Sequence, residues 1–327
     1  MEGDTRVTKR RVLLAGLAAL ASSPIALLAQ SHVADSLLEH GALMKAESVF
    51  YAAVRVHPHD PVARRELGTY LVQRGAPRVG MTLFEEAERF GAEPRTVSRL
   101  LAPVYLSLGE YHALATLPSS PLTRGELERA RWLDAHPTNI VAPDSVLTAV
   151  YHAATEPGTL GHVTIRVNGR PLEAVVSVRS RGIIVSESNP AAKGLRHFAA
   201  ASPKEKVTSG APAVADSIGL GRLTVLHYPV TLERLGEGVP AVIGLDVLGR
   251  FAPTFDPRTD RVTLRTSGRA DLRISDGDAL PTRITDGDFL VLRAGGWTSA
   301  AAPPMTRLLS EHRWTLDARR GQILVER

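Results

Sequence analysis

Residues in the first half of the chain recur at a fixed interval of 34 positions, and this period restricts the possible folds more than any other feature. The coinciding residues are Gly41 with Gly75 and Gly109, Phe50 with Phe84, Ala53 with Ala87, and Leu67 with Leu101. A small residue, Ala46 or Gly80, stands five positions after each of the first two glycines. The pattern predicts pairs of short helices that are joined at the glycine and pack closely at the small residue.

Residues 33–118 resemble the tetratricopeptide repeat family over about two and a half units. The third unit is shortened because Pro118 ends its second helix, and an apparent capping helix follows from Thr123 to Ala135. The resemblance implies that residues 31–140 form a stacked helical array whose groove binds an extended peptide or another protein. Docking against the second half of the chain is an equally consistent role.

The N-terminus has the order of a secretory signal peptide. Three basic residues, Lys9 to Arg11, precede the apolar run Val12–Ala21 and a small-residue stretch that ends at Ala29. We therefore expect residues 1–30 to direct export to the periplasm or cell envelope. Residues 12–29 are also long enough to remain as a membrane anchor.

Composition excludes several classes of site. The chain has no cysteine, so disulfides, thiolate nucleophiles and cysteine zinc sites are ruled out. Its formal net charge is +5, but the arginines are scattered through every segment, which argues against nucleic-acid binding. The His57–Asp60 cluster falls in an interhelix turn, and the Asp-Gly pairs at 276–277 and 286–287 lack EF-hand spacing. We expect neither a metal nor a cofactor.

The hydrophobic period changes to two after about Gly161, following a linker expected over residues 141–160. Val163–Val167 and Leu172–Val176 flank Asn168-Gly169, which predicts a β-hairpin. Further strands are expected at Gly182–Ser186, Gly219–His227, Ala241–Gly244 and Arg261–Arg265. The second half of the chain is therefore expected to be all β.

These elements, in this order, resemble one lobe of a retropepsin-type aspartic protease, and we assign it to residues 161–268. The most specific pieces are Ile243-Gly244-Leu245-Asp246 and Phe255-Asp256. The lobe's ending, from Phe251 to Arg265, is echoed from His312 to Glu326, so residues 269–327 are interpreted as a truncated second lobe. The expected fold class is multidomain α plus β: a tetratricopeptide-type array followed by a retropepsin-like lobe.

The turn that carries the catalytic motif in this family is altered here. The family reads Asp-Thr/Ser-Gly at this turn, whereas this chain has Ser177, Val178 and Arg179, and only the later Gly182 and Ser186 match. The aspartic mechanism needs two carboxylates that share one proton, and a serine hydroxyl cannot replace either of them. A serine nucleophile would need a base close by, and the sequence brings none of His162, His197 and His227 to Ser177.

The chain is thus expected to be a non-catalytic scaffold that holds an extended peptide by strand addition. The expected cleft residues are Ser177, Arg179, Gly182, Ile243 and Gly244. The alternative is an active aspartic peptidase whose catalytic aspartate is Asp246 or Asp256. A third possibility is a homodimer through the β domain, with the repeats binding a partner in the cell envelope.

Overall fold

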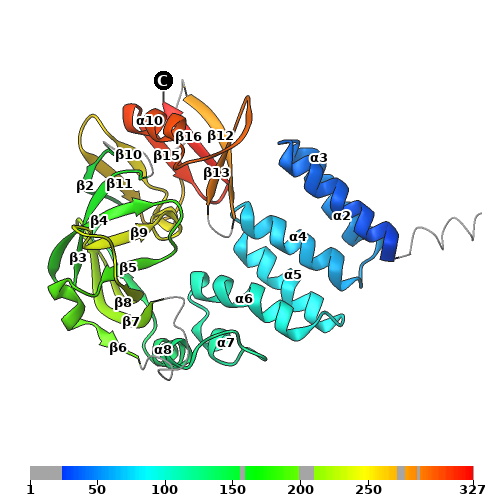
Figure 1. Ribbon diagram of the computed structural model, residues 1–327, viewed down its shortest axis with the longest axis horizontal. Coiled ribbons are helices and arrows are strands. Elements are labelled where there is room, and N and C mark those ends of the chain that lie inside the picture. Colours follow the sequence, from blue (N-terminus) through cyan, green and yellow to red (C-terminus); the bar gives the residue numbers. More distant parts are fainter. Residues whose placement is uncertain (1–23, 155–158, 199–209, 271–276, 286–287, 327) are drawn as a thin grey trace, which may run out of the picture.

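The computed structural model describes residues 24–154, 159–198, 210–270, 277–285 and 288–326. Helices form the first part of the chain, and a β body with two short helices forms the rest (Figure 1). Residues 12–23 of the predicted export segment lie outside the described residues, and residues 24–29 belong to the first described helix. Within the described ranges, no helix is long and apolar enough to cross a membrane.

The helical part consists of three helix pairs and a final helix. They are α2 (Pro24–Glu39), α3 (Leu43–Val56), α4 (Pro61–Gln73), α5 (Pro77–Arg89), α6 (Pro94–Leu108), α7 (Tyr111–Ala115) and α8 (Arg124–Ala135). The glycines at the 34-residue interval join the two helices of each pair, and Gly41, Gly75 and Gly109 have φ values of 73°, 85° and 74°. Glycine adopts this left-handed conformation without steric cost, so the sequence period sets where each pair turns.

Local signals explain where the last two helices begin and end. Helix α7 ends at Ala115, three residues before Pro118. Thr123 precedes α8 and accepts a hydrogen bond from the backbone N–H of Glu126, whose side chain bonds back to the N-cap. This capping box satisfies two backbone donors that the helix leaves free.

The β part is built on one continuous path of paired strands. Its strands are β1 (Asn139–Val141), β2 (Val146–His152), β3 (His162–Val167), β4 (Arg170–Ser177), β5 (Ile183–Ser186), β6 (Arg196–His197), β7 (Ala211–Leu220), β8 (Leu223–Glu233), β9 (Ala241–Gly244), β10 (Thr254–Asp256), β11 (Arg261–Arg265), β12 (Gly277–Ile284), β13 (Phe289–Arg293), β14 (Gly296–Ser299), β15 (Trp314–Asp317) and β16 (Gln322–Glu326). The path runs β14-β13-β12-β16-β15-β10-β11-β2-β3-β4-β9-β5-β8-β7-β6, and β1 pairs with β8. The expected hairpin is present, because Asn168 and Gly169 turn with positive φ between β3 and β4.

Two expectations about the β part differ from the structure. Residues 146–152, which were assigned to a linker, form β2 between β3 and β11, and this strand alternates buried and exposed side chains. The strand expected over Gly219–His227 is instead the bend of a long hairpin, since Gly221 turns with φ 57° between β7 and β8.

The two echoed endings form matching hairpins that pair with each other. The β10–β11 hairpin follows α9 (Leu245–Leu248), and the β15–β16 hairpin follows α10 (Pro303–Glu311). At their junction the hydroxyls of Thr254 and Thr315 lie 2.8 Å apart, and the rings of Phe255 and Trp314 stack with centroids 4.2 Å apart. The strand β10 is therefore hydrogen-bonded on both sides within one chain.

The helical array docks on the β body through its glycine turns. At the first turn, the Trp297 indole N–H donates to the carbonyl of Leu38 at 2.6 Å. At the second turn, the Arg74 guanidinium donates to the carbonyl oxygens of Gly321, at 3.0 Å, and of Thr282. At the third turn, Arg250 donates to the carbonyl of Ser107. One edge of the repeat array is thus engaged within the molecule.

Gly75 is the tightest of these contacts, and we expect its replacement by alanine to loosen the docking. A Cβ atom at Gly75 would lie 1.8 Å from the carbonyl oxygen of Ala318, whereas one at Gly91, which also has positive φ, meets nothing within 4 Å. Gly91→Ala should cost about 1–2 kcal/mol of unfolding free energy from backbone strain alone. Gly75→Ala should cost at least about 2 kcal/mol more, because backbone atoms must also move.

Urea unfolding of the two alanine variants and the parent chain measures this difference. Equal losses for Gly75→Ala and Gly91→Ala would show that the docking contact contributes nothing to stability.

Candidate functional site

The expected site lies where strands β4 and β9 end side by side. These two strands run parallel, with Ser177 in register with Gly244. Strand β5 returns antiparallel to β9 on its other side, so the turn of residues 178–182 passes over the end of β9. The crossing brings the turn of residues 178–182 against Gly244 and Asp246, which are more than sixty residues away in the sequence.

The hydroxyl of Ser177 is fully occupied within its own turn. Its Oγ accepts the backbone N–H of Arg179 at 3.1 Å and that of Ser180 at 3.0 Å, and it donates to the Ser180 hydroxyl at 3.1 Å. A serine hydroxyl has one hydrogen and two acceptor lone pairs, so this arrangement satisfies the whole group. Ser177 therefore stabilises the turn.

Among the described residues, Asp246 supplies a carboxylate that contacts the turn. Both of its oxygens accept the backbone N–H of Gly182 at 3.1 Å. Solvent reaches this side chain, yet the surrounding protein desolvates it and raises the pKa of Asp246, while the Gly182 N–H and the positive charges of Arg250 and Arg181 act in the opposite direction. Within the described part of the chain, the charges that act on this carboxylate are those of Arg250 and Arg181.

Close backbone approach explains the glycines of the expected site. A Cβ atom at Gly244 would lie 2.4 Å from the Ser180 carbonyl oxygen and 2.2 Å from an Asp246 oxygen, so only glycine fits there. Gly182 is required for a different reason, since its φ is 70° while the space around a Cβ is open. Both glycines are therefore needed for the backbone conformation of this turn and its close packing.

The other expected cleft residues are divided between the core and the surface. The Ile243 side chain is completely buried in the β core, and Val178 is also buried, so neither can contact a ligand with its side chain. Arg179 is exposed on the turn. The structure thus brings Ser177, Gly182 and Gly244 together, with Arg179 at the surface and Ile243 beneath them.

Sequence reasoning did not identify the residues that border Asp246 on the helical side. The Arg250 guanidinium lies 6.0 Å from the centroid of the Tyr228 ring and bonds to Ser107 of α6. Burial raises the pKa of the Tyr228 hydroxyl, and the Asp246 charge adds to this effect. The third glycine turn of the array therefore lies beside the candidate site. The 34-residue period located that turn, but nothing in the sequence connected it to Asp246.

Asp256, the other candidate aspartate, has a structural role. It accepts the backbone N–H of Arg258 at 3.0 Å in the β10–β11 turn, and Arg313 lies 3.9 Å away as an ion-pair partner. Asp60 also has a local role, since it caps α4 by accepting the backbone N–H groups of Val62 and Ala63. Of the two Asp-Gly pairs, Asp276, Asp286 and Gly287 lie outside the described residues. No group of three or more metal-binding side chains occurs among the residues that the structure describes.

The three histidines considered as bases lie elsewhere. The His197 ring contacts the Ala192 carbonyl and the His227 ring contacts the Pro137 carbonyl, while His162 stands opposite Val175 and His152 in the sheet. Among the described hydrogen bonds, none joins a histidine to Ser177. A serine hydrolase mechanism therefore lacks its base at this site.

Comparison with known proteins yields distant structural similarities only. No protein-family profile and no curated protein matches the sequence. The structure is similar to a retropepsin-like aspartic protease from Rickettsia conorii, with a TM-score of 0.26 and 16% identity over 39% of this chain and 92% of that protein. It is also similar to basic 7S globulin from soybean, with a TM-score of 0.23 and 13% identity over 47% of this chain and 56% of that protein. The site is therefore interpreted from its own residues.

The bonding of Ser177 predicts how substitutions there affect stability. Ser177→Ala leaves two backbone N–H groups without their acceptor and should lower the unfolding free energy by about 1 kcal/mol, as loss of a helix cap does. Ser177→Asp should retain most of the stability, because a carboxylate accepts the same two N–H groups. Thermal unfolding of both variants measures this. An alanine variant as stable as the parent chain would contradict the assigned bonds.

The raised pKa of Asp246 predicts a pH effect on stability. Because the folded pKa exceeds the unfolded value, the group stabilises the fold fully only below its unfolded pKa of about 3.9, and this contribution disappears as pH rises through the folded pKa. The unfolding free energy of the parent chain minus that of Asp246→Asn should therefore fall between about pH 3 and the raised pKa.

Urea unfolding at several pH values measures the difference, and NMR titration of the Asp246 carboxyl carbon measures the pKa itself. A midpoint below the ordinary aspartate value would mean that the arginines outweigh desolvation at this site.

Proposed function

We propose that this chain is an exported, non-catalytic relative of the retropepsin-like aspartic proteases, in which a tetratricopeptide-type array is fused to the altered protease lobe. It acts as a scaffold that binds a peptide or protein segment. The observation that carries the proposal is the bonding of Ser177, whose hydroxyl is used entirely by its own turn. At this position the mechanism would require a carboxylate that exchanges a proton with a second one.

The geometry around Asp246 also favours binding over hydrolysis. A single carboxylate that is held by a backbone N–H and lies near arginines cannot act as base and acid at once. The exposed Arg179 gives the turn a positive charge where the family has catalytic acids. We therefore expect the bound segment to place an acidic or carbonyl group at this turn. We do not expect it to place a scissile bond between two acids.

Export and membrane attachment rest on the order of residues 1–30 alone. The role of the helical array rests on its turns. Its glycine edge is engaged with the β body, so a partner would bind the helix faces that remain free. Both roles are part of the proposal.

A peptidase assay tests the proposal against its alternative, an active aspartic peptidase. We expect the full chain to hydrolyse denatured casein no faster than Asp246→Asn at any pH from about 3 to about 7. A pepstatin-sensitive activity that is lost in Asp246→Asn and retained in Ser177→Ala would assign catalysis to Asp246. An activity lost in Ser177→Ala would equally overturn a non-catalytic role.

A further inference from the structure

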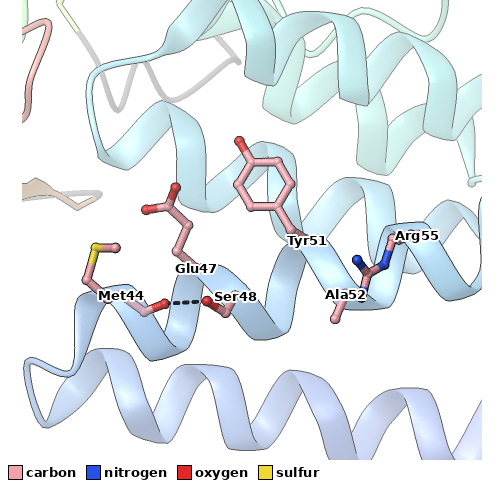
Figure 2. A pocket seen from close by; sticks show the side chains of 6 residues that line it. All are labelled: Met44, Glu47, Ser48, Tyr51, Ala52 and Arg55. Atoms are coloured by element: carbon pink, nitrogen blue, oxygen red, sulfur yellow. Dashed lines mark hydrogen bonds between the residues drawn. The ribbon is translucent and has the colours of Figure 1, made fainter.

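One face of helix α3 is exposed and partly apolar. The side chains of Met44 and Tyr51 are 79% and 47% exposed. They border an open pocket of about 460 Å³ whose lining lies entirely on this helix: Met44, Glu47, Ser48, Tyr51, Ala52 and Arg55. Figure 2 shows Glu47 and Tyr51 projecting from one side of α3, with Met44 and Arg55 toward its two ends. An exposed helix face of this kind is typical of a contact surface.

The charges on this face are placed symmetrically around Tyr51. Glu47 precedes it by four residues and Arg55 follows it by four, so each charge lies about 6 Å along the helix from the tyrosine. Glu47 is held in place because one of its oxygens accepts the Tyr70 hydroxyl at 3.1 Å. Within the described part of the chain, Arg55 makes no ion pair or hydrogen bond. The face thus has the carboxylate of Glu47, held by Tyr70, toward one end and the guanidinium of Arg55, with no described bonding partner, toward the other.

We propose that this face binds a second copy of the chain, with two α3 helices packed antiparallel about a two-fold axis at Tyr51. In such an interface, residue i of one copy contacts residue j of the other, and the reverse contact also forms. The axis at Tyr51 therefore places Glu47 opposite Arg55 on both sides. The small side chains of Ser48 and Ala52 allow the helices to approach to the usual 8–10 Å between axes.

This surface differs from the one that the family resemblance suggests. A homodimer through the β domain was one possibility raised by the sequence, whereas the face proposed here lies on the helical array. Although α3 starts just after the Gly41 turn that meets Leu292, none of the residues that line its exposed face takes part in the described hydrogen bonds between the array and the β body. The proposed dimer is therefore compatible with those docking bonds.

Cysteine crosslinking of the full chain tests the two-fold axis directly. The chain has no cysteine, so Tyr51→Cys introduces a single thiol, and that thiol faces its own copy at the axis. We expect an oxidant to convert Tyr51→Cys into a disulfide-linked dimer, visible on a non-reducing gel, about tenfold faster than Arg131→Cys. Arg131 is an exposed residue of α8, away from the proposed interface, and serves as the matched control.

Charge reversal in the Tyr51→Cys background tests the pairing and separates it from folding defects. Glu47→Arg alone or Arg55→Glu alone should each slow the crosslinking about tenfold, because like charges then face each other twice. Mixing the two variants should restore the rate, since each supplies the charge that the other lacks. The proposal would be overturned if Tyr51→Cys crosslinked no faster than the Arg131→Cys control. It would also be overturned if the crosslinking rate did not change on charge reversal and on mixing of the two variants.

Discussion

The arrangement of the molecule depends on backbone turns that pack against backbone. At Gly75, a left-handed turn brings the array within contact of the Ala318 carbonyl, and the neighbouring Arg74 donates to the Gly321 carbonyl. The contact at Gly75 tolerates no Cβ atom, so it fixes the array's distance from the β body at this turn, whereas a Cβ atom at Gly109 would meet only Tyr111 of the array itself. Because the glycines recur every 34 residues, the same kind of turn faces the β body in each repeat. The 34-residue period of the glycines therefore also determines which edge of the array docks on the β body.

The candidate site follows the same rule of close backbone approach. The parallel pairing of β4 with β9 forces the turn after Ser177 over Gly244, where only a glycine leaves room for the Ser180 carbonyl. The serine at position 177 supports this geometry, since it accepts the turn's N–H groups much as a carboxylate would. The shape of the turn alone therefore says nothing about hydrolysis.

The helix pairs and the first hairpin could be predicted because their signals are local. Gly41, Gly75, Gly109 and Asn168-Gly169 all turn where a left-handed conformation is needed. Strand β2 was missed because Val146–His152 depends on pairing with β11, more than a hundred residues away. At the site, the altered motif was visible in the sequence, whereas the contact between Asp246 and Gly182 was not. That contact arises from strand order, which no local pattern encodes.

The two echoed hairpins share one buried junction. Strands β10 and β15 pair antiparallel, the hydroxyls of Thr254 and Thr315 lie 2.8 Å apart there, and the Phe255 ring stacks on the Trp314 ring. All four of these side chains are buried, and β10 is also paired with β11 on its other side. The sequence echo therefore corresponds to two hairpins that bury their matching residues against each other, which leaves β10 without a free edge.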